Sequence, residues 1–78
     1  MARYGKKTNL SSSAVVEKAL KFFETERGFQ VGEECGDMVT FTSKIGYITI
    51  TLCENGETDV EIETREFDYD VKEFMSKI

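Results

Sequence analysis

The sequence predicts a small α+β domain in which four antiparallel strands form a sheet packed against two helices, one near each end of the chain. Two observations support this prediction. Apolar residues recur with a helical period in residues 14–23 and 71–78, and with a period of two residues between Phe29 and Ile62. The connections between the alternating segments are short and rich in glycine, which favours hairpins over parallel βαβ units. We therefore expect a two-layer sandwich with a meander sheet and the element order α-β-β-β-β-α.

The length of 78 residues allows one domain, because a compact core cannot be divided further at this size. Residues 1–10 have a weak pattern, and we expect them to form a tail or a short edge strand. Residues 11–78 then make up the single α+β domain.

The first helix has clear signals at both ends. Ser11, Ser12 and Ser13 offer N-cap oxygens immediately before the apolar residues of helical spacing, and Gly28 can take the left-handed conformation that ends a helix. The apolar stripe between these signals is Val16, Ala19, Leu20 and Phe23.

Four segments with a period of two follow Gly28, and each is predicted to be a strand. Their apolar residues are Phe29 and Val31, then Val39 and Phe41, then Ile48, Ile50 and Leu52, and finally Val60 and Ile62. A four-residue loop at residues 43–46 joins the second strand to the third. It sets Phe41 opposite Ile48 and Val39 opposite Ile50.

The turn between the last two strands decides which residues share the inner face. A two-residue turn at Asn55 and Gly56 would place Ile50 opposite Glu61, and so would bring an acid onto the apolar face. A three-residue loop at residues 54–56, with Gly56 as a bulge at positive φ, avoids this. The pairs expected from this loop are Ile50 with Val60 and Ile48 with Ile62.

The same register defines an outer face of polar β-branched residues with an acidic border. Its expected rows are Met38, Thr51 and Asp59; Thr40, Thr49 and Glu61; and Thr42, Tyr47 and Glu63.

The chain ends in a second amphipathic helix, with a stripe at i, i+3, i+4 and i+7. Asp70 followed three residues later by Glu73 is typical of a capping box, and Tyr69 can pack on Phe74 as a hydrophobic staple. The stripe consists of Val71, Phe74, Met75 and Ile78.

Charge and composition exclude several classes of function. The net charge is −5 and most acids lie in residues 54–73, whereas nucleic-acid binding requires clustered Lys and Arg. No apolar run is long enough to span a membrane and no signal peptide is evident, so we expect a cytoplasmic protein that binds neither nucleic acid nor membrane.

Residues able to carry out catalysis are few. Histidine is absent, which removes the commonest general base near neutral pH and the commonest zinc ligand. Cys35 and Cys53 form no C-x-x-C motif, and we expect both to be reduced thiols. We therefore expect no catalytic residues, no metal and no cofactor, and we do not expect an enzyme.

The outer face of the sheet is the surface best suited to a function. An aromatic side chain among hydroxyl groups with an acidic border can bind a protein partner or a second copy of the chain. The candidate residues are Thr40, Thr42, Tyr47, Thr49, Thr51, Glu61 and Glu63. The alternative is a protein that binds a small apolar ligand in a pocket between the sheet and the C-terminal helix, lined by Phe22, Phe41, Tyr69 and Met75.

Residues 46–54 (GYITITLCE) and 63–74 (ETREFDYDVKEF) resemble short uncharacterised prokaryotic proteins that end in a T-R-E-aromatic-D-Y-x-V-K-E-F pattern. This resemblance covers about the second half of the chain and implies no activity and no site residues. The cap, staple and stripe of the last helix account for much of the ending. They leave Thr64, Arg65 and Glu66 without an assigned role.

Overall fold

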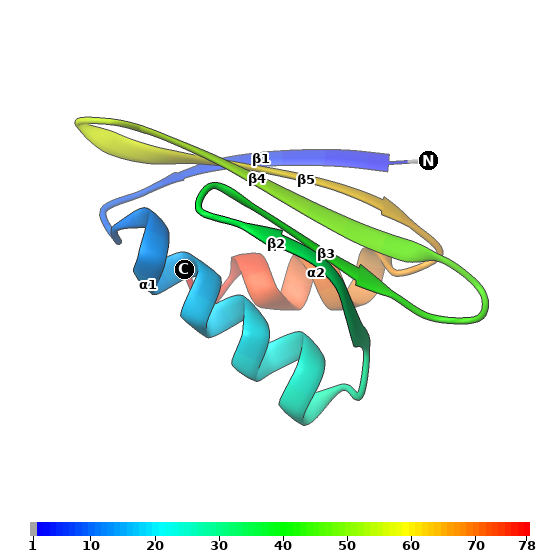
Figure 1. The fold of residues 1–78 in the computed structure, drawn as a ribbon. Helices are drawn as coiled ribbons and strands as arrows, with labels where there is room; N and C mark the ends of the chain where they lie inside the picture. The colour runs from blue at the N-terminus through cyan, green and yellow to red at the C-terminus, as the bar shows by residue number, and fades with distance from the viewer. Residues whose placement is uncertain (1) are drawn as a thin grey trace.

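The computed structural model describes residues 2–78, which form a five-stranded antiparallel sheet with all of the helices on one face (Figure 1). The strands follow the order β1-β5-β4-β3-β2 across the sheet. Their bounds are β1 (Ala2–Thr8), β2 (Gln30–Cys35), β3 (Met38–Thr42), β4 (Tyr47–Asn55) and β5 (Glu57–Arg65). The helices are α1 (Ser12–Ala19), which continues directly into the π-helix η1 (Leu20–Glu26), and α2 (Asp68–Met75). The predicted α+β class is confirmed.

The prediction of four strands is wrong. The sheet has a fifth strand, because residues 2–8 form β1 and pair with β5 along their whole length. The sheet is therefore not a simple meander. The sequence of β1 hides its role, since Tyr4 is its only large apolar side chain. Polar side chains attach it to α2 and to the chain segment after it: Lys6 Nζ donates to the Met75 carbonyl at 2.7 Å, and Thr8 Oγ1 donates to the Ile78 carbonyl at 3.0 Å.

The first helix begins and ends as its signals predicted. Ser11 Oγ accepts a hydrogen bond from the Ala14 amide at 3.2 Å, and Gly28 closes the helix at φ +79°. Between them the helix widens from α to π. The wide turn still directs both Phe22 and Phe23 into the core, where they are 3% and 0% exposed.

An aromatic cluster fills the space between the helices and the sheet. The ring centre of Phe23 lies 5.0 Å from that of Phe41 on β3 and 5.2 Å from that of Phe74 on α2, and Phe22 packs against Phe74 at 5.8 Å. Burying one large apolar side chain of this kind stabilises the folded state by about 1.5 to 3 kcal/mol. The cluster therefore joins three elements that are distant in sequence.

The register of the sheet matches the prediction on one side of β4 and differs on the other. Phe41 lies opposite Ile48 and Val39 opposite Ile50, as predicted. Between β4 and β5, however, Ile50 faces Ile62, which is a shift of two residues from the expected pairs. Gly56 does have positive φ, at +84°, and no two-residue turn forms. The actual pairs are Leu52 with Val60, Ile50 with Ile62 and Ile48 with Thr64.

The shift has a physical reason in two threonines. The turn is centred one residue later than predicted, on Gly56 with Asn55 opposite Glu57, so the buried Leu52 meets Val60 rather than Thr58. Thr58 and Thr64 are both buried, and each satisfies its hydroxyl within the chain. Thr58 Oγ1 donates to the Leu10 carbonyl at 2.6 Å, and Thr64 Oγ1 donates to the Tyr47 carbonyl at 3.0 Å.

The start of α2 also differs from the prediction. Glu66 has φ +81°, which turns the chain sharply after β5, and the helix begins at Asp68 with Phe67 as its N-cap. Asp70 is therefore inside the helix and forms no capping box. Tyr69 is 75% exposed and does not pack on Phe74 as a staple.

Within residues 2–78, no helix has the length and apolar character needed to cross a membrane.

Candidate functional site

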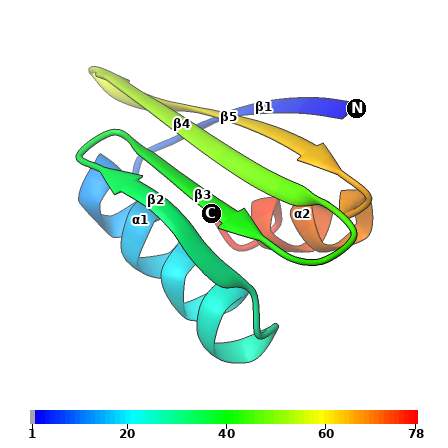
Figure 2. The same ribbon diagram turned by 45° about the vertical axis from the view of Figure 1, so that its right-hand side comes forward.

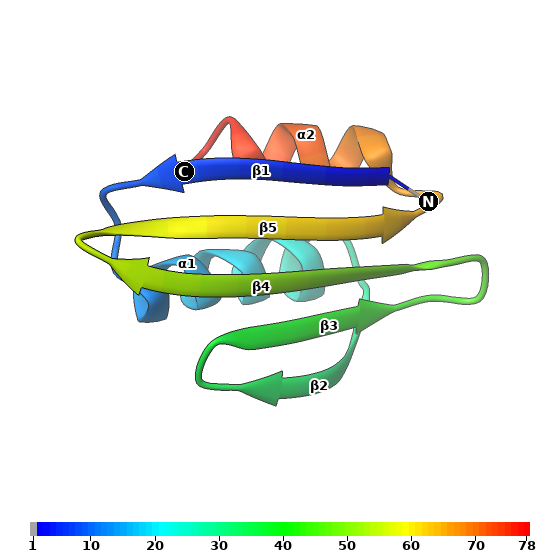
Figure 3. The same ribbon diagram turned by 90° about the horizontal axis from the view of Figure 1, so that it is seen from above.

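One face of the sheet, which we call the outer face, carries no helix. Seen from above, the sheet lies nearest the viewer and every helix lies beneath it or beyond its edge (Figure 3). The view in Figure 2 shows the same two layers after a turn of 45°. The seven residues singled out in the sequence lie on β3, β4 and β5 and alternate with the buried residues of those strands.

The strand register arranges these side chains in rows across the outer face. The shift between β4 and β5 moves the acids relative to the predicted rows: Glu61 faces Thr51, and Glu63 faces Thr49 rather than Tyr47. Arg65, which the sequence left without a role, is the residue opposite Tyr47. Strand β1 adds Arg3 opposite Glu63, and Gly5 opposite Glu61.

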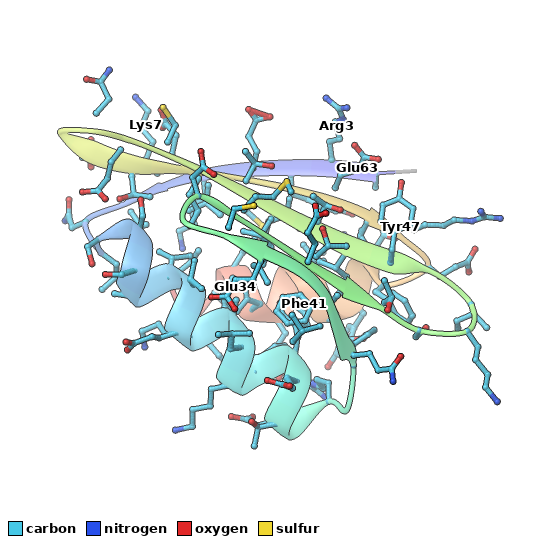
Figure 4. All side chains as sticks on the ribbon, viewed as in Figure 1. Arg3, Lys7, Glu34, Phe41, Tyr47 and Glu63 are labelled. Carbon is cyan, nitrogen blue, oxygen red and sulfur yellow. The ribbon has the colours of Figure 1, made fainter. Side chains whose placement is uncertain are left out.

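Glu63 is the centre of a polar cluster at one corner of the outer face. Its two carboxylate oxygens have separate partners, since Oε2 accepts from the Tyr47 hydroxyl at 2.6 Å and Oε1 lies 3.1 Å from Arg3 Nη2 (Figure 4). The side chains come from three adjacent strands, β1, β4 and β5. The cluster therefore fixes the orientation of the Tyr47 ring over the sheet.

The same contacts shift the titration of both groups. The hydrogen bond from Tyr47 lowers the pKa of Glu63, with the Arg3 guanidinium acting in the same direction against partial desolvation. The bond to the anionic Glu63 raises the pKa of Tyr47 above 10.0, and partial desolvation adds to this. At neutral pH Tyr47 is therefore a neutral donor and Glu63 an anion.

An open hollow of about 690 Å³ lies beside this cluster, where β5 ends and α2 begins. Next to the lining residue Tyr47, Gly46 leaves no room for a side chain, because a Cβ at that position would overlap the Arg65 carbonyl oxygen. The close approach presses the start of β4 against the end of β5. The lining residues are Ala2, Tyr47, Thr64, Arg65, Glu66 and Asp68.

Sequence reasoning missed the arginines of this region. Arg3 lay in a segment of weak pattern, and Arg65 could be placed opposite Tyr47 only with the correct register. The alternation of Arg3, Gly5 and Lys7 with Tyr4 and Lys6 was a signal for a strand, but it lacked the apolar residues that usually mark one.

The acids and cysteines of the described residues are spread over the surface of the fold. No group of three or more Cys, Asp or Glu side chains within residues 2–78 is placed to hold a metal ion. Cys35 and Cys53 are both exposed and form no disulfide with each other.

The residues of the alternative, apolar pocket do not gather around one space. Phe22 and Phe41 are packed inside the aromatic cluster, Met75 is half-buried, and Tyr69 is exposed to solvent. The volume expected for a ligand between sheet and helix is filled by aromatic rings.

No protein-family model and no curated protein matches the chain.

Proposed function

We propose that the protein is a non-enzymatic interaction module that binds a protein partner through the outer face of its sheet. The observation that carries the proposal is the one-sided arrangement of the fold. All helices pack on the inner face, and the outer face presents an ordered polar surface across its strands (Figures 1 and 3).

The side chains on this face are of the kind that form protein interfaces. Tyrosine and arginine are the residues most enriched among interface hot spots, and Tyr47 and Arg65 lie side by side at the corner next to the open hollow. Threonines on β3 and β4 form the middle of the face and offer both hydroxyl and methyl groups. Because the hydrogen bond to Glu63 holds the Tyr47 ring in place, little side-chain freedom is lost when a partner binds there.

The electrostatics of the face argue against two other functions. A carboxyl group acting as general acid needs a raised pKa, whereas the Tyr47 and Arg3 contacts lower that of Glu63. The four acids of β5 would repel a phosphate backbone; they are Glu57, Asp59, Glu61 and Glu63. A cytoplasmic location, also part of this proposal, agrees with exposed cysteines that form no disulfide.

The experiment that tests this proposal compares two threonine-to-arginine variants in affinity capture from the native organism. Thr51→Arg places a long cation on the outer face, and Thr25→Arg makes the same change on the exposed side of η1. Both positions are exposed, so we expect each variant to melt close to the wild-type temperature.

The proposal expects a partner that co-purifies with the wild type and with Thr25→Arg but is lost, or reduced at least tenfold, with Thr51→Arg. Capture that is unaffected by Thr51→Arg, or equally reduced by both variants, would contradict binding through the outer face.

A further inference from the structure

The two edges of the sheet carry opposite charge. Strand β1 forms one edge and contains Arg3, Lys6 and Lys7 but no acid. Strand β2 forms the other edge and contains Glu33 and Glu34 but no basic residue. In the described residues Arg3 pairs with Glu63, and no ion pair joins Lys7, Glu33 or Glu34 to another side chain.

The charges also match face by face. Lys6 lies opposite the buried Val60 and Glu34 opposite the buried Val39, so both are on the inner side of the sheet. Lys7 is opposite Asp59 on the outer side. Glu33 is opposite Thr40, which is also on the outer side. A sheet that continued from β2 into a second β1 would therefore meet unlike charges on both of its faces.

The shapes of the two edges are complementary as well. Seen from above, α2 lies beyond β1 on the side away from β5, so part of this helix has no strand over it (Figure 3). Tyr69 and Lys72 on α2 are exposed, and Met75 is half-buried. Beneath most of β2 the same view shows no helix, although η1 contacts this strand. On the inner side of β2, Val31 is half-buried and Glu34 is exposed. Figure 4 shows Glu34 below the sheet on this open side.

We propose that the protein assembles head to tail, with β2 of one copy pairing with β1 of the next and lying over that copy's α2. All neighbouring strands are antiparallel and three strands lie between the two edge strands, so β1 and β2 run in the same direction. Copies with their helices on the same side would therefore pair in parallel. Placing Glu34 of one copy beside Lys6 of the next sets the register of the two strands. Val31 then lies beside Tyr4, because the bulge between Val31 and Glu33 takes up one extra residue of β2.

Pairing between identical edges is disfavoured by the same residues. A β1–β1 contact brings Lys and Arg together, and a β2–β2 contact brings Glu against Glu. Charges and bulges on edge strands commonly protect a sheet from uncontrolled association. Here the charges disfavour contacts between two β1 strands or between two β2 strands, and they favour the contact of β1 with β2. Such a contact is heterologous, so it leads to a ring or an open chain of copies rather than a two-fold dimer.

The first measurement is sedimentation of the wild-type protein from about 10 µM to about 1 mM, a range that covers weak self-association. The weight-average mass should rise with concentration above the 8.9 kDa of one chain. It should fall again with added salt, because the screening length shrinks from about 30 Å at 0.01 M to about 3 Å at 1 M. A mass of one chain at every concentration in low salt would overturn the proposal.

Charge reversal then identifies the surfaces. Lys6→Glu with Lys7→Glu makes both edges acidic, and Glu33→Lys with Glu34→Lys makes both edges basic. Each variant alone should remain monomeric, and an equimolar mixture should regain the mass of the wild type. Failure of the mixture to associate would contradict pairing of β1 with β2. The control is Lys18→Glu with Lys21→Glu, which changes the net charge equally on the exposed side of the first helix and should associate like the wild type. A control that fails to associate would show an effect of net charge alone.

One measurement does not depend on variants, which matters because Lys6→Glu also removes the bond to Met75. In a dilution series followed by amide NMR, the signals of β1, β2 and the exposed side of α2 should move with concentration. Movement confined to the outer face of β4 and β5 would instead show association through that face. The edge variants change none of the seven candidate residues on β3, β4 and β5, so this proposal and the proposed function can fail separately.

Discussion

Gly46 is the residue on which the corner beside Tyr47 most depends. Among the described glycines it has the closest backbone neighbour, the carbonyl oxygen of Arg65. That contact aligns the start of β4 with the end of β5, and Thr64 reinforces it through its bond to the Tyr47 carbonyl. Thr64, Arg65 and Glu66 thus gain structural roles that the sequence alone did not indicate: a buried hydroxyl, a backbone contact and a positive-φ turn.

Replacing Gly46 with Ala should destabilise the protein by about 1 to 3 kcal/mol, the usual cost of inserting a methyl group where there is no space. Gly36→Ala is the matched control, because a Cβ there meets nothing within 4 Å. It should change stability by less than about 0.5 kcal/mol. Urea unfolding measures both free energies, and equal values for the two variants would show that the close approach at Gly46 does not contribute to stability.

The titration of Tyr47 tests the polar cluster around Glu63. Since the bond to the Glu63 anion raises the pKa of Tyr47, the variant Glu63→Gln should move that pKa back toward 10.0. Glu61→Gln removes a charge from the same strand without breaking the bond between Tyr47 and Glu63. It should shift the pKa of Tyr47 much less. Because the bond from Tyr4 to Asp68 also raises the pKa of Tyr4, ring-carbon NMR is needed to follow each tyrosine separately.

The same two shifts give the pH range in which this bond stabilises the fold. The pKa of Tyr47 is raised on folding, so its contribution is complete below its unfolded pKa and is lost as pH rises through the folded value. The pKa of Glu63 is lowered, so its contribution is present above its unfolded pKa and is lost as pH falls through the folded value. The wild type should therefore lose its stability advantage over Glu63→Gln toward both strong acid and strong alkali.

At the level of secondary-structure elements, the sequence was most informative where a pattern depended on neighbours within the chain. The cap at Ser11, the stop at Gly28 and the β3–β4 register were all predicted correctly. The β4–β5 register was not, because alternation fixes which side chains face inward but does not distinguish registers that differ by two residues. Strand β1 was left undecided because its contacts are polar and reach residues 64 to 70 positions away.

The start of α2 shows how a tertiary contact can resemble a local signal. Asp70 and Glu73 have the spacing of a capping box, yet both face Arg27 at the end of the first helix. Arg27 Nη2 lies 2.7 Å from Glu73 Oε2, and Arg27 Nε lies 3.6 Å from Asp70 Oδ1. The guanidinium also covers the Phe22 ring at 4.8 Å. The two acids therefore hold the end of the first helix against α2.

Two substitutions at Asp70 separate an ion pair from a cap. Asparagine caps a helix about as well as aspartate, so a capping role would be kept in Asp70→Asn and lost in Asp70→Ala. The ion pair with Arg27 is lost in both. We expect both variants to be destabilised to a similar extent, by about 0.2 to 1 kcal/mol as for other exposed pairs. Ser11→Ala, which removes a cap present in the structure, should cost about 0.5 to 2 kcal/mol. Thermal unfolding measures the stability of the three variants. An Asp70→Asn variant as stable as the wild type would show that Asp70 acts as a helix cap after all.

At the scale of the whole molecule, the sheet continues from β1 to β2 across the full width of the fold. Strand β1 pairs with the last strand in the sequence, so residues 2–8 close the domain rather than extend from it. Candidate residues could be placed on the outer face from sequence alternation alone. The corner formed by Arg3, Tyr47, Glu63 and Arg65 could not be predicted, because it requires the pairing of both ends of the chain.

Amide hydrogen exchange can decide whether β1 is an integral strand of the folded domain. A domain of 78 residues has a total stability of about 4 to 12 kcal/mol, from about 0.05 to 0.15 kcal/mol per residue. If β1 unfolds only with the whole domain, its amides that bond to β5 should show protection close to that of the β4–β5 ladder. The other edge provides the comparison, since β2 contains a bulge and is exposed along most of its length. We expect its amides to exchange at least tenfold faster than those of β1. The reverse order, with β1 exchanging as fast as an unstructured peptide, would mean that residues 2–8 are a tail. The polar contacts of Tyr4, Lys6 and Thr8 with residues 68–78 would then be too weak to hold β1 in place.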